Sequence, residues 1–237
     1  MIELEMRKLA GSEVLHAFPH GKADSALPCI VFYHGFTSSK QVYSYFAVTL
    51  ALAGFRVIMP DALDHGSRFS GNGARRMQRF WPILLNSCHE FAVLKEAIVE
   101  KGWLEEDRLA VAGASMGGMT ALGIMTHHPE VKCVASLMGS GYLTSLSRSL
   151  FPSLEMPAEL TEWDVGHQLE KLAARPLLLW HGEDDDVVPA AETFRLQQAM
   201  QRQGLDHKLT CHWQAGVRHR ITPEALDVTV AFFKQFL

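Results

Sequence analysis

The sequence predicts an α/β fold whose mostly parallel sheet is covered by helices on both faces. Short and almost continuously apolar segments, such as 28–35 and 55–61, alternate with longer amphipathic segments, such as 81–101. Strands that are apolar along their whole length are typical of a sheet buried on both faces. The alternation of strand and helix indicates parallel strands joined by crossover helices. With 48% hydrophobic and 20% charged residues, the chain has the composition of a globular protein that folds throughout.

The predicted elements follow one another with short connections. The strand over 28–35 is followed by a helix over 41–53, which ends at Gly54 because glycine readily takes the left-handed conformation that terminates helices. A helix over 116–128 stops before Pro129, since proline cannot continue a helix. The same alternation gives the remaining elements: strands at 55–61, 108–113, 131–139, 175–182 and 207–214, and helices at 81–101, 190–203 and from about 223 onward.

Two stretches interrupt this alternation. Residues 66–77 are rich in glycine and arginine, and residues 142–172 are too long for a simple connection. Open α/β sheets bind ligands beyond the carboxyl ends of their strands, so both insertions are expected near a functional site. The length of 237 residues suits one domain of this class, and we expect a single domain over 1–237.

Charge and composition argue against several kinds of partner. The chain has 22 Lys and Arg against 26 Asp and Glu, a net charge of −4, so neither nucleic acid nor a membrane surface is expected as a partner. The N-terminus carries glutamates where a secretory signal would be apolar, and no stretch of roughly 18 apolar residues occurs, so we expect a cytoplasmic protein. No metal or cofactor motif is present. Four cysteines are expected to be reduced packing residues: Cys29, Cys88, Cys133 and Cys211.

The stretch GASMGG at 113–118 predicts a nucleophilic serine, Ser115. It lies where an apolar strand gives way to a helix, and a sharp turn there would hold a hydroxyl clear of the sheet. Such a turn crowds its neighbours, which explains glycine at positions 113 and 117. The first amide of the following helix, that of Met116, points toward the serine oxygen and is expected to stabilise a negative charge on a reacting carbonyl.

A serine nucleophile needs a base, and His219 is the best placed of 12 histidines. It stands in the polar loop 215–222, after the last predicted strand and before the last helix, which places it above the same edge of the sheet. The other candidates lie inside a strand, at the end of a helix or within the second insertion: His212, His127, His128 and His167.

The acid that would orient this histidine comes from the segment HGEDDDVVP at 181–189. Asp184, Asp185 and Asp186 follow a predicted strand directly. Successive residues of an extended loop point in different directions, so only one of the three is expected to reach the imidazole. Spacing alone does not choose among them.

The negative charge on the reacting carbonyl oxygen, the oxyanion, needs a second hydrogen-bond donor beside the Met116 amide. We expect it from HGFTSS at 34–39, which follows the first buried strand. A turn at this point would direct the Phe36 amide toward the same pocket as the Met116 amide. We expect His34 to hold this turn, and it is also a candidate for contact with the substrate. His65 in the next loop is expected to structure that loop.

These segments together resemble the α/β-hydrolase superfamily over nearly the whole chain, and within it the YjfP-like carboxylesterases of enterobacteria, which neighbour the dienelactone hydrolase and prolyl-oligopeptidase-like groups. HGF at 34–36 resembles the oxyanion turn, PDALDHGSR at 60–68 the D-x-x-G-H-G-type loop, GASMGG the nucleophile elbow and GVRHR the histidine loop. The family pattern H-G-x-x-D-x-x-V-P selects Asp185 as the acid. Dienelactone hydrolases carry cysteine where this chain has Ser115. The resemblance implies an α/β-hydrolase fold with about eight strands, a small cap at 142–172, no cofactor and hydrolysis of short acyl esters.

The sequence leaves alternatives open for the residues that bind the substrate. Tyr142, Leu143 and Leu146 are candidates for a hydrophobic acyl slot, although apolar residues at helical spacing commonly pack a core instead. A basic cluster in the first insertion is interpreted as a solvated face, with binding of an acyl-CoA phosphate as the alternative: Arg68, Arg75, Arg76 and Arg79.

The sequence therefore predicts a serine carboxylesterase that acts on small acyl esters through Ser115, Asp185 and His219, with no metal. Acyl-CoA thioesterase and small-peptidase activities use the same side chains and remain alternatives. The alternative from another functional class is a binding protein that has the hydrolase fold but no catalytic activity.

Overall fold

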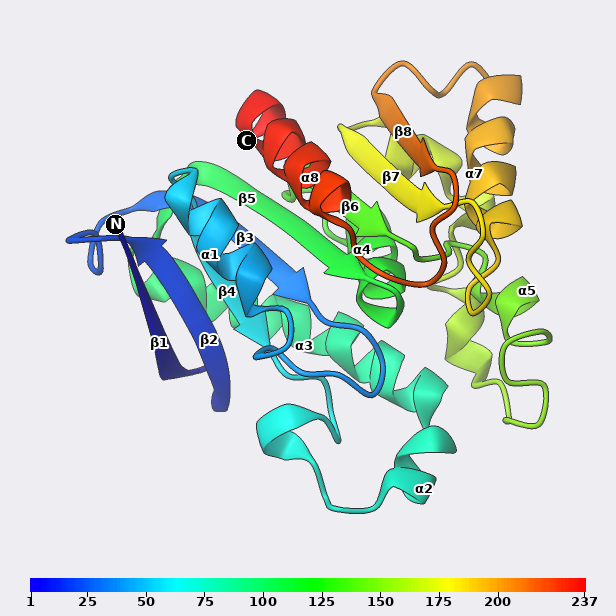
Figure 1. Cartoon of the computed structure of the whole chain (residues 1–237), viewed down its shortest axis with the longest axis horizontal. Coiled ribbons are helices and arrows are strands. Elements are labelled where there is room, and N and C mark those ends of the chain that lie inside the picture. Colours follow the sequence, from blue (N-terminus) through cyan, green and yellow to red (C-terminus); the bar gives the residue numbers. More distant parts are fainter.

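Eight strands form one sheet in the computed structural model, which describes residues 1–237 (Figure 1). The strand order is β1-β2-β4-β3-β5-β6-β7-β8. β1 pairs antiparallel with β2 and β2 with β4, whereas every other pair is parallel. The strands are β1 (Ile2–Leu9), β2 (Ser12–Pro19), β3 (Leu27–Tyr33), β4 (Arg56–Pro60), β5 (Leu104–Ala114), β6 (Cys133–Leu137), β7 (Leu177–Gly182) and β8 (Leu209–Gln214). The predicted fold class, an α/β-hydrolase sheet of eight mostly parallel strands, is confirmed.

The N-terminal hairpin of β1 and β2 was not predicted, because β1 is not apolar along its length. As the outermost strand, β1 is largely exposed and alternates apolar and charged side chains along IELEMRKL. Ala10 and Gly11 form its two-residue turn with φ values of 51° and 78°, the left-handed conformation that tight hairpins require. Alternation over residues 2–7, followed by the turn residues Ala10 and Gly11, is the signal that identifies this hairpin.

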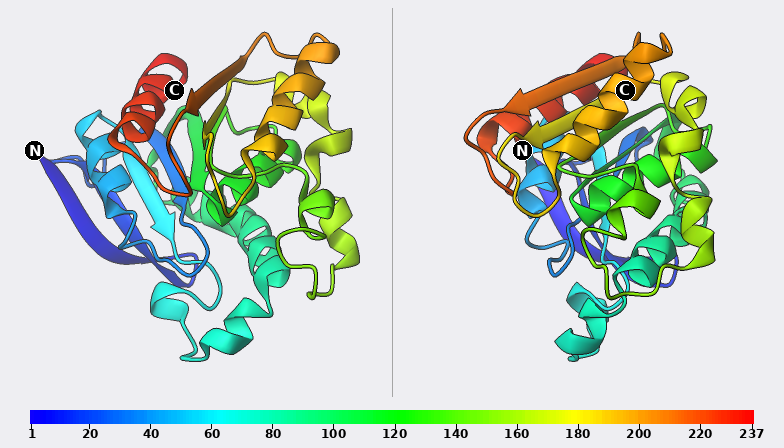
Figure 2. Two further views of the ribbon diagram at one scale, coloured as in Figure 1. Left: turned by 45° about the vertical axis from the view of Figure 1, so that its right-hand side comes forward. Right: turned by 90° about the vertical axis from the view of Figure 1, so that its right-hand side faces the viewer.

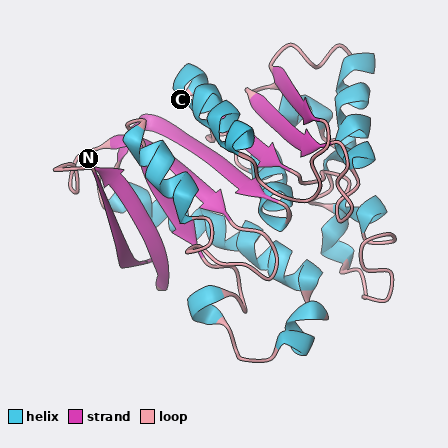
Figure 3. Ribbon diagram, viewed as in Figure 1, coloured by secondary structure: helices cyan, strands magenta, loops and turns pink.

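Helices cover both faces of the sheet. α1 (Ser44–Leu52) and α8 (Pro223–Phe236) lie on one face, where Phe46 and Phe233 enter the core. α3 (Phe80–Glu100), α4 (Met116–His127), α6 (Leu169–Ala173) and α7 (Ala190–Arg202) cover the other. The parallel strands end at a common edge, beside the long loops (Figure 3). None of the helices combines the length and apolarity that a membrane-spanning segment requires. The cysteines are all unpaired, and three of them are buried.

Both predicted insertions lie at this edge. The first holds the short helices η1 (Gly66–Arg68) and α2 (Gly73–Met77) and extends away from the body of the protein (Figures 1 and 2). The second holds α5 (Leu143–Leu146), η2 (Ala158–Thr161), η3 (Val165–His167) and α6. Since α6 packs into the core of the sheet, only the part before it lies over the strand ends.

Candidate active site

Ser115 occupies a sharp turn between β5 and α4. Its backbone has φ 56° and ψ −119°, a strained conformation for a residue with a side chain. Close contacts exclude any larger neighbour: a β-carbon on Gly113 would lie 2.2 Å from the carbonyl oxygen of Gly117, and one on Gly117 would lie 2.0 Å from that of Tyr33. The glycines of GASMGG therefore allow β5, α4 and β3 to meet beneath the serine.

The structure brings the three predicted triad residues together from distant parts of the chain. The Ser115 hydroxyl donates to His219 Nε2 across 2.9 Å, and His219 Nδ1 donates to Asp185 Oδ2 across 2.7 Å. His219 lies in the loop between β8 and α8, and its side chain is 18% exposed. The hydroxyl and the imidazole are therefore already at the distance that proton transfer requires.

Asp185 is the member of the acidic run that reaches the histidine. Its side chain is fully buried. Burial by itself would raise the pKa of this carboxyl, but hydrogen bonds from His181, His219 and the Val187 amide outweigh burial and hold the pKa well below its usual range. Asp184 is exposed, and Asp186, also exposed, forms an ion pair with Arg218. Neither flanking carboxylate is directed at the imidazole.

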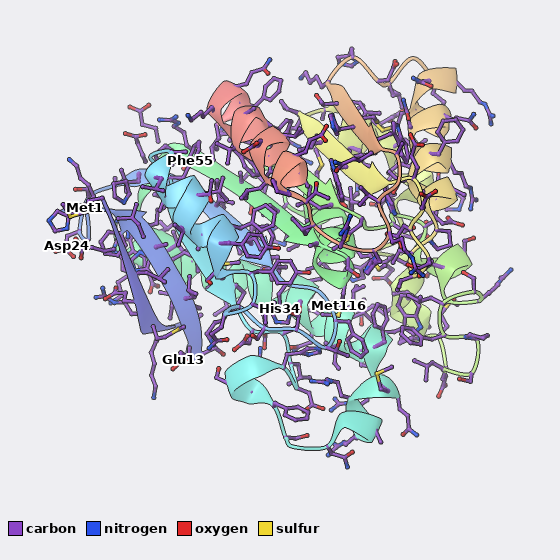
Figure 4. The ribbon with its side chains drawn as sticks, viewed as in Figure 1. Met1, Glu13, Asp24, His34, Phe55 and Met116 are labelled. Carbon is purple, nitrogen blue, oxygen red and sulfur yellow. The ribbon has the colours of Figure 1, made fainter.

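The turn after β3 lies against the serine. A β-carbon on Gly35 would lie 3.5 Å from the Ser115 Cβ, and one on Gly117 would lie 2.8 Å from the His34 carbonyl oxygen, and His34 and Met116 lie close together in Figure 4. The Phe36 amide donates to no acceptor within the protein. The Met116 amide opens α4 and so has no acceptor one turn earlier in the helix. Two backbone donors are thus available beside the Ser115 hydroxyl.

Two buried histidines fix this turn. His34 Nδ1 donates to the Gly35 carbonyl oxygen at 2.7 Å, and Nε2 accepts from the Ala62 amide at 3.0 Å. His65 Nε2 accepts from the Thr37 amide at 2.9 Å. Burial lowers the pKa of both rings, to about 4 for His34, so both are neutral acceptors near pH 7. With both nitrogens of His34 engaged, the structure favours its role in the turn over contact with a substrate.

A buried ion pair behind the turn was not predicted. The Lys40 ammonium group is fully buried and contacts the Asp61 carboxylate, and it also lies 3.0 Å from Ser67 Oγ and 3.1 Å from Glu13 Oε1. The Lys40 amide donates to the second oxygen of Asp61 at 2.9 Å. The only sequence signal for this pair is a lysine four residues after Phe36, which is indistinguishable from a surface lysine.

The candidate substrate residues separate into two groups. Leu143 and Leu146 are buried in one cluster with Met116, so they lie on the serine side of the cap. Tyr142 belongs instead to the core of the sheet, and its ring lies 4.0 Å beneath the Arg195 guanidinium. This corrects the expectation that Tyr142 lines the same slot.

The arginines of the predicted basic cluster differ in their contacts. Arg68 makes a two-pronged ion pair with Glu90 at 2.7 and 2.8 Å. The Arg76 guanidinium lies 4.6 Å from the centre of the Phe69 ring. The charge of Arg68 is therefore already paired, which leaves Arg75, Arg76 and Arg79 as the candidates for binding a phosphate. No three His, Cys, Asp or Glu side chains are arranged to hold a metal ion.

Comparison with known proteins places the chain in a family. Residues 43–237 match the model of the prolyl oligopeptidase family. The chain is 63% identical to esterase YjfP of Escherichia coli strain K12 and 32% identical to the putative esterase YitV of Bacillus subtilis strain 168, in both cases over the full length of both proteins. Among solved structures, TT1662 from Thermus thermophilus superposes with a TM-score of 0.82 at 24% identity, covering 99% of this chain and 98% of that one. The chain therefore belongs to the prolyl oligopeptidase family and is an enzyme, a serine hydrolase with the α/β-hydrolase fold.

Proposed function

We propose that this enzyme is a carboxylesterase that hydrolyses short-chain acyl esters with Ser115 as nucleophile, Asp185 as acid and His219 as base. The observation that carries the proposal is the pair of short contacts at His219, 2.9 Å to the Ser115 hydroxyl and 2.7 Å to the Asp185 carboxylate. The names of the two full-length relatives, both esterases, support an ester as the substrate.

The reaction proceeds in two displacements. His219 Nε2 takes the hydroxyl proton as Ser115 Oγ attacks the ester carbonyl carbon, and the same nitrogen then gives that proton to the departing alcohol. Water loses a proton to His219, attacks the acyl group and releases the carboxylic acid, while the proton returns to Oγ. Asp185 holds the imidazole in the required tautomer and stabilises its charged form.

The amides of Phe36 and Met116 hold the oxyanion in both displacements. Each such donor stabilises the transition state by about 3 kcal/mol when it is positioned beforehand. The neutral rings of His34 and His65 fix the Phe36 turn without adding a competing charge.

An aromatic wall supports a short acyl group. The ring of Phe36 lies 4.9 Å from that of Phe80 and 6.2 Å from that of Phe151, and the last two are 4.7 Å apart. Leu143 and Leu146 fill the space beside this wall. We expect a chain of a few carbons to lie against these rings and Phe151 to limit a longer chain.

Peptide hydrolysis is the second candidate, because the matching family is named for an oligopeptidase. An acylaminoacyl peptidase from Pyrococcus horikoshii superposes with a TM-score of 0.76 at 16% identity, but this chain covers only 42% of it. That likeness supports the fold but not a peptide substrate, so an ester remains the favoured substrate.

Aryl esters of two, four and eight acyl carbons, an acyl-CoA and an aminoacyl amide, each tested on the wild type and Ser115→Ala, will discriminate these functions. We expect the two- and four-carbon esters to be cleaved fastest and Ser115→Ala to be inactive. A fluorophosphonate probe should label the wild type and not the variant. Preferred cleavage of the amide would overturn the ester assignment. Unlabelled wild type with no turnover would indicate a silent site.

A further inference from the structure

The Asp185 carboxylate lies beside two histidine rings. Its Oδ2 atom lies 2.7 Å from His219 Nδ1 and 3.1 Å from His181 Nε2. Its Oδ1 atom accepts the amides of Val187 and Val188, each at 2.9 Å. The side chains of Asp185 and His181 are both fully buried. The base thus shares its acid with a second imidazole that never meets solvent.

The surroundings of His181 determine where its protons lie. Nε2 faces the Asp185 carboxylate and, at 2.9 Å, the carbonyl oxygen of Val188, and neither can donate while the carboxylate is ionised. Nε2 therefore carries a hydrogen. Nδ1 lies 2.8 Å from Thr193 Oγ1, and that oxygen lies 2.9 Å from the Gly139 carbonyl. Whether Nδ1 accepts from the hydroxyl or donates to it, the Nε2 hydrogen bonds to the Val188 carbonyl oxygen and lies on the side of Asp185 Oδ2, which is 3.1 Å from Nε2.

These contacts anchor the acid to three elements. His181 belongs to β7, Thr193 to α7, and Gly139 follows β6. His219, in contrast, lies in a loop and is partly exposed. The Asp185 carboxylate therefore lies between the buried His181 ring and the His219 ring, which it orients.

We propose that His181 is a positioning residue of the triad, which keeps the Asp185 carboxylate aimed at His219; this inference rests on the proposed function. It has two consequences. Without the His181 donor the buried carboxylate can rotate, so the turnover rate falls. Without that N–H the Asp185 charge also faces His219 as its only imidazole partner, so the acid limb of the rate profile moves to higher pH.

The groups that face His181 are few. Asp185 and, through it, His219 are the charged or titratable neighbours on the loop side. On β8 the indole of Trp213 lies with its ring centre 6.3 Å away. On α7 the nearest charged side chain in sequence to Thr193 is Glu192, which pairs with Arg195 at 3.6 Å. A change at His181 is therefore transmitted to the reaction through Asp185.

Two substitutions of similar size separate positioning from packing. His181→Gln keeps an N–H at the end of the side chain, whereas His181→Leu removes it. We expect His181→Leu to lower kcat about tenfold with little change in KM, and to move the acid limb of the kcat/KM profile up by roughly half a pH unit. We expect His181→Gln to restore most of the rate and the original acid limb. His212→Leu, at a histidine of β8 that pairs with Glu224, is the matched control.

Combination with Asp185→Asn provides the decisive comparison. If His181 acts through the acid, His181→Leu costs tenfold in the wild type and almost nothing in the Asp185→Asn background. Equal losses in both backgrounds, or a normal acid limb in His181→Leu, would overturn the inference. Should His181→Leu fail to fold, Thr193→Val, which removes the hydroxyl that orients His181, is measured in the same two backgrounds. Retained turnover in Ser115→Ala would instead count against the proposed function.

Discussion

The His34 ring and the Ala62 amide are joined by a hydrogen bond of 3.0 Å, which ties the turn after β3 to the loop after β4. The ring accepts this bond only while Nε2 is unprotonated. Burial lowers the pKa of His34 to about 4, so the bond persists through neutral pH. The geometry of this turn, which carries the proposed oxyanion donor Phe36, thus depends on a histidine that stays uncharged.

This bond predicts an acid-dependent loss of stability. The pKa of His34 is about 4 in the folded protein and 6.5 in its ordinary state, so the unfolded chain binds the proton first. The free energy of unfolding is therefore highest above pH 6.5 and falls as the pH drops toward 4.

Urea unfolding at pH 7 and pH 5 measures this fall, and the loss of unfolding free energy between the two pH values should be smaller for His34→Gln than for the wild type. His20→Gln, at a largely exposed histidine, should behave as wild type, and an unchanged pH dependence in His34→Gln contradicts this account.

The strained backbone of Ser115 predicts a trade between stability and activity. Glycine adopts a φ of 56° without steric strain, whereas alanine keeps the β-carbon that causes the strain. Ser115→Gly should therefore have a free energy of unfolding about 1 kcal/mol higher than Ser115→Ala. Both variants should lose at least about 10⁴ in kcat. Equal stability of the two variants would show that the turn stores no strain.

The buried pair of Lys40 and Asp61 predicts a large effect of a substitution that touches no substrate. Lys40→Met leaves the Asp61 carboxylate buried without its partner, which costs about 3 to 5 kcal/mol in the free energy of unfolding. Lys95→Met is the control, because Lys95 pairs with Glu130 at 2.6 Å in a partly exposed position and such pairs are worth about 1 kcal/mol or less. Similar losses in denaturant unfolding of the two variants would contradict the prediction.

The aromatic wall predicts a change of acyl preference. Phe151→Ala removes one of the three rings and opens the space beside Phe36 and Phe80. The ratio of kcat/KM for an eight-carbon ester to that for acetate should rise about tenfold, the discrimination that a few methylenes provide in an apolar pocket. Phe69→Ala, at an exposed ring beneath Arg76, should leave this ratio unchanged. If Phe151→Ala also leaves it unchanged, the wall does not limit chain length.

Much of the fold could be read from the sequence because buried parallel strands are apolar throughout. β3, β4 and β7 each stand out as short apolar runs, and the helices end at glycine or proline. The edge strand β1 could not be found in this way, since one of its faces is solvated and its pattern alternates. The same elements explain why Ser115 and His219 were recognisable: each sits in a turn that a regular strand or helix delimits.

The supporting residues of the site were much harder to predict. Lys40 acts through a contact with a segment distant in the sequence. His181 acts through Asp185, which is one of three neighbouring aspartates. A buried histidine or lysine looks like any other until its partners are in place. Tyr142 was misplaced for the related reason that helical spacing gives the direction of a side chain but not the layer into which it points.

The hydrogen bond between Ser115 and His219 joins residues 104 positions apart, so the enzyme is active only after its C-terminal loop has docked onto a sheet begun far earlier in the chain. Contacts of such long range are slow to form. In refolding from denaturant, recovery of esterase turnover should therefore lag behind recovery of helical circular dichroism, which makes catalysis a reporter of the final docking step.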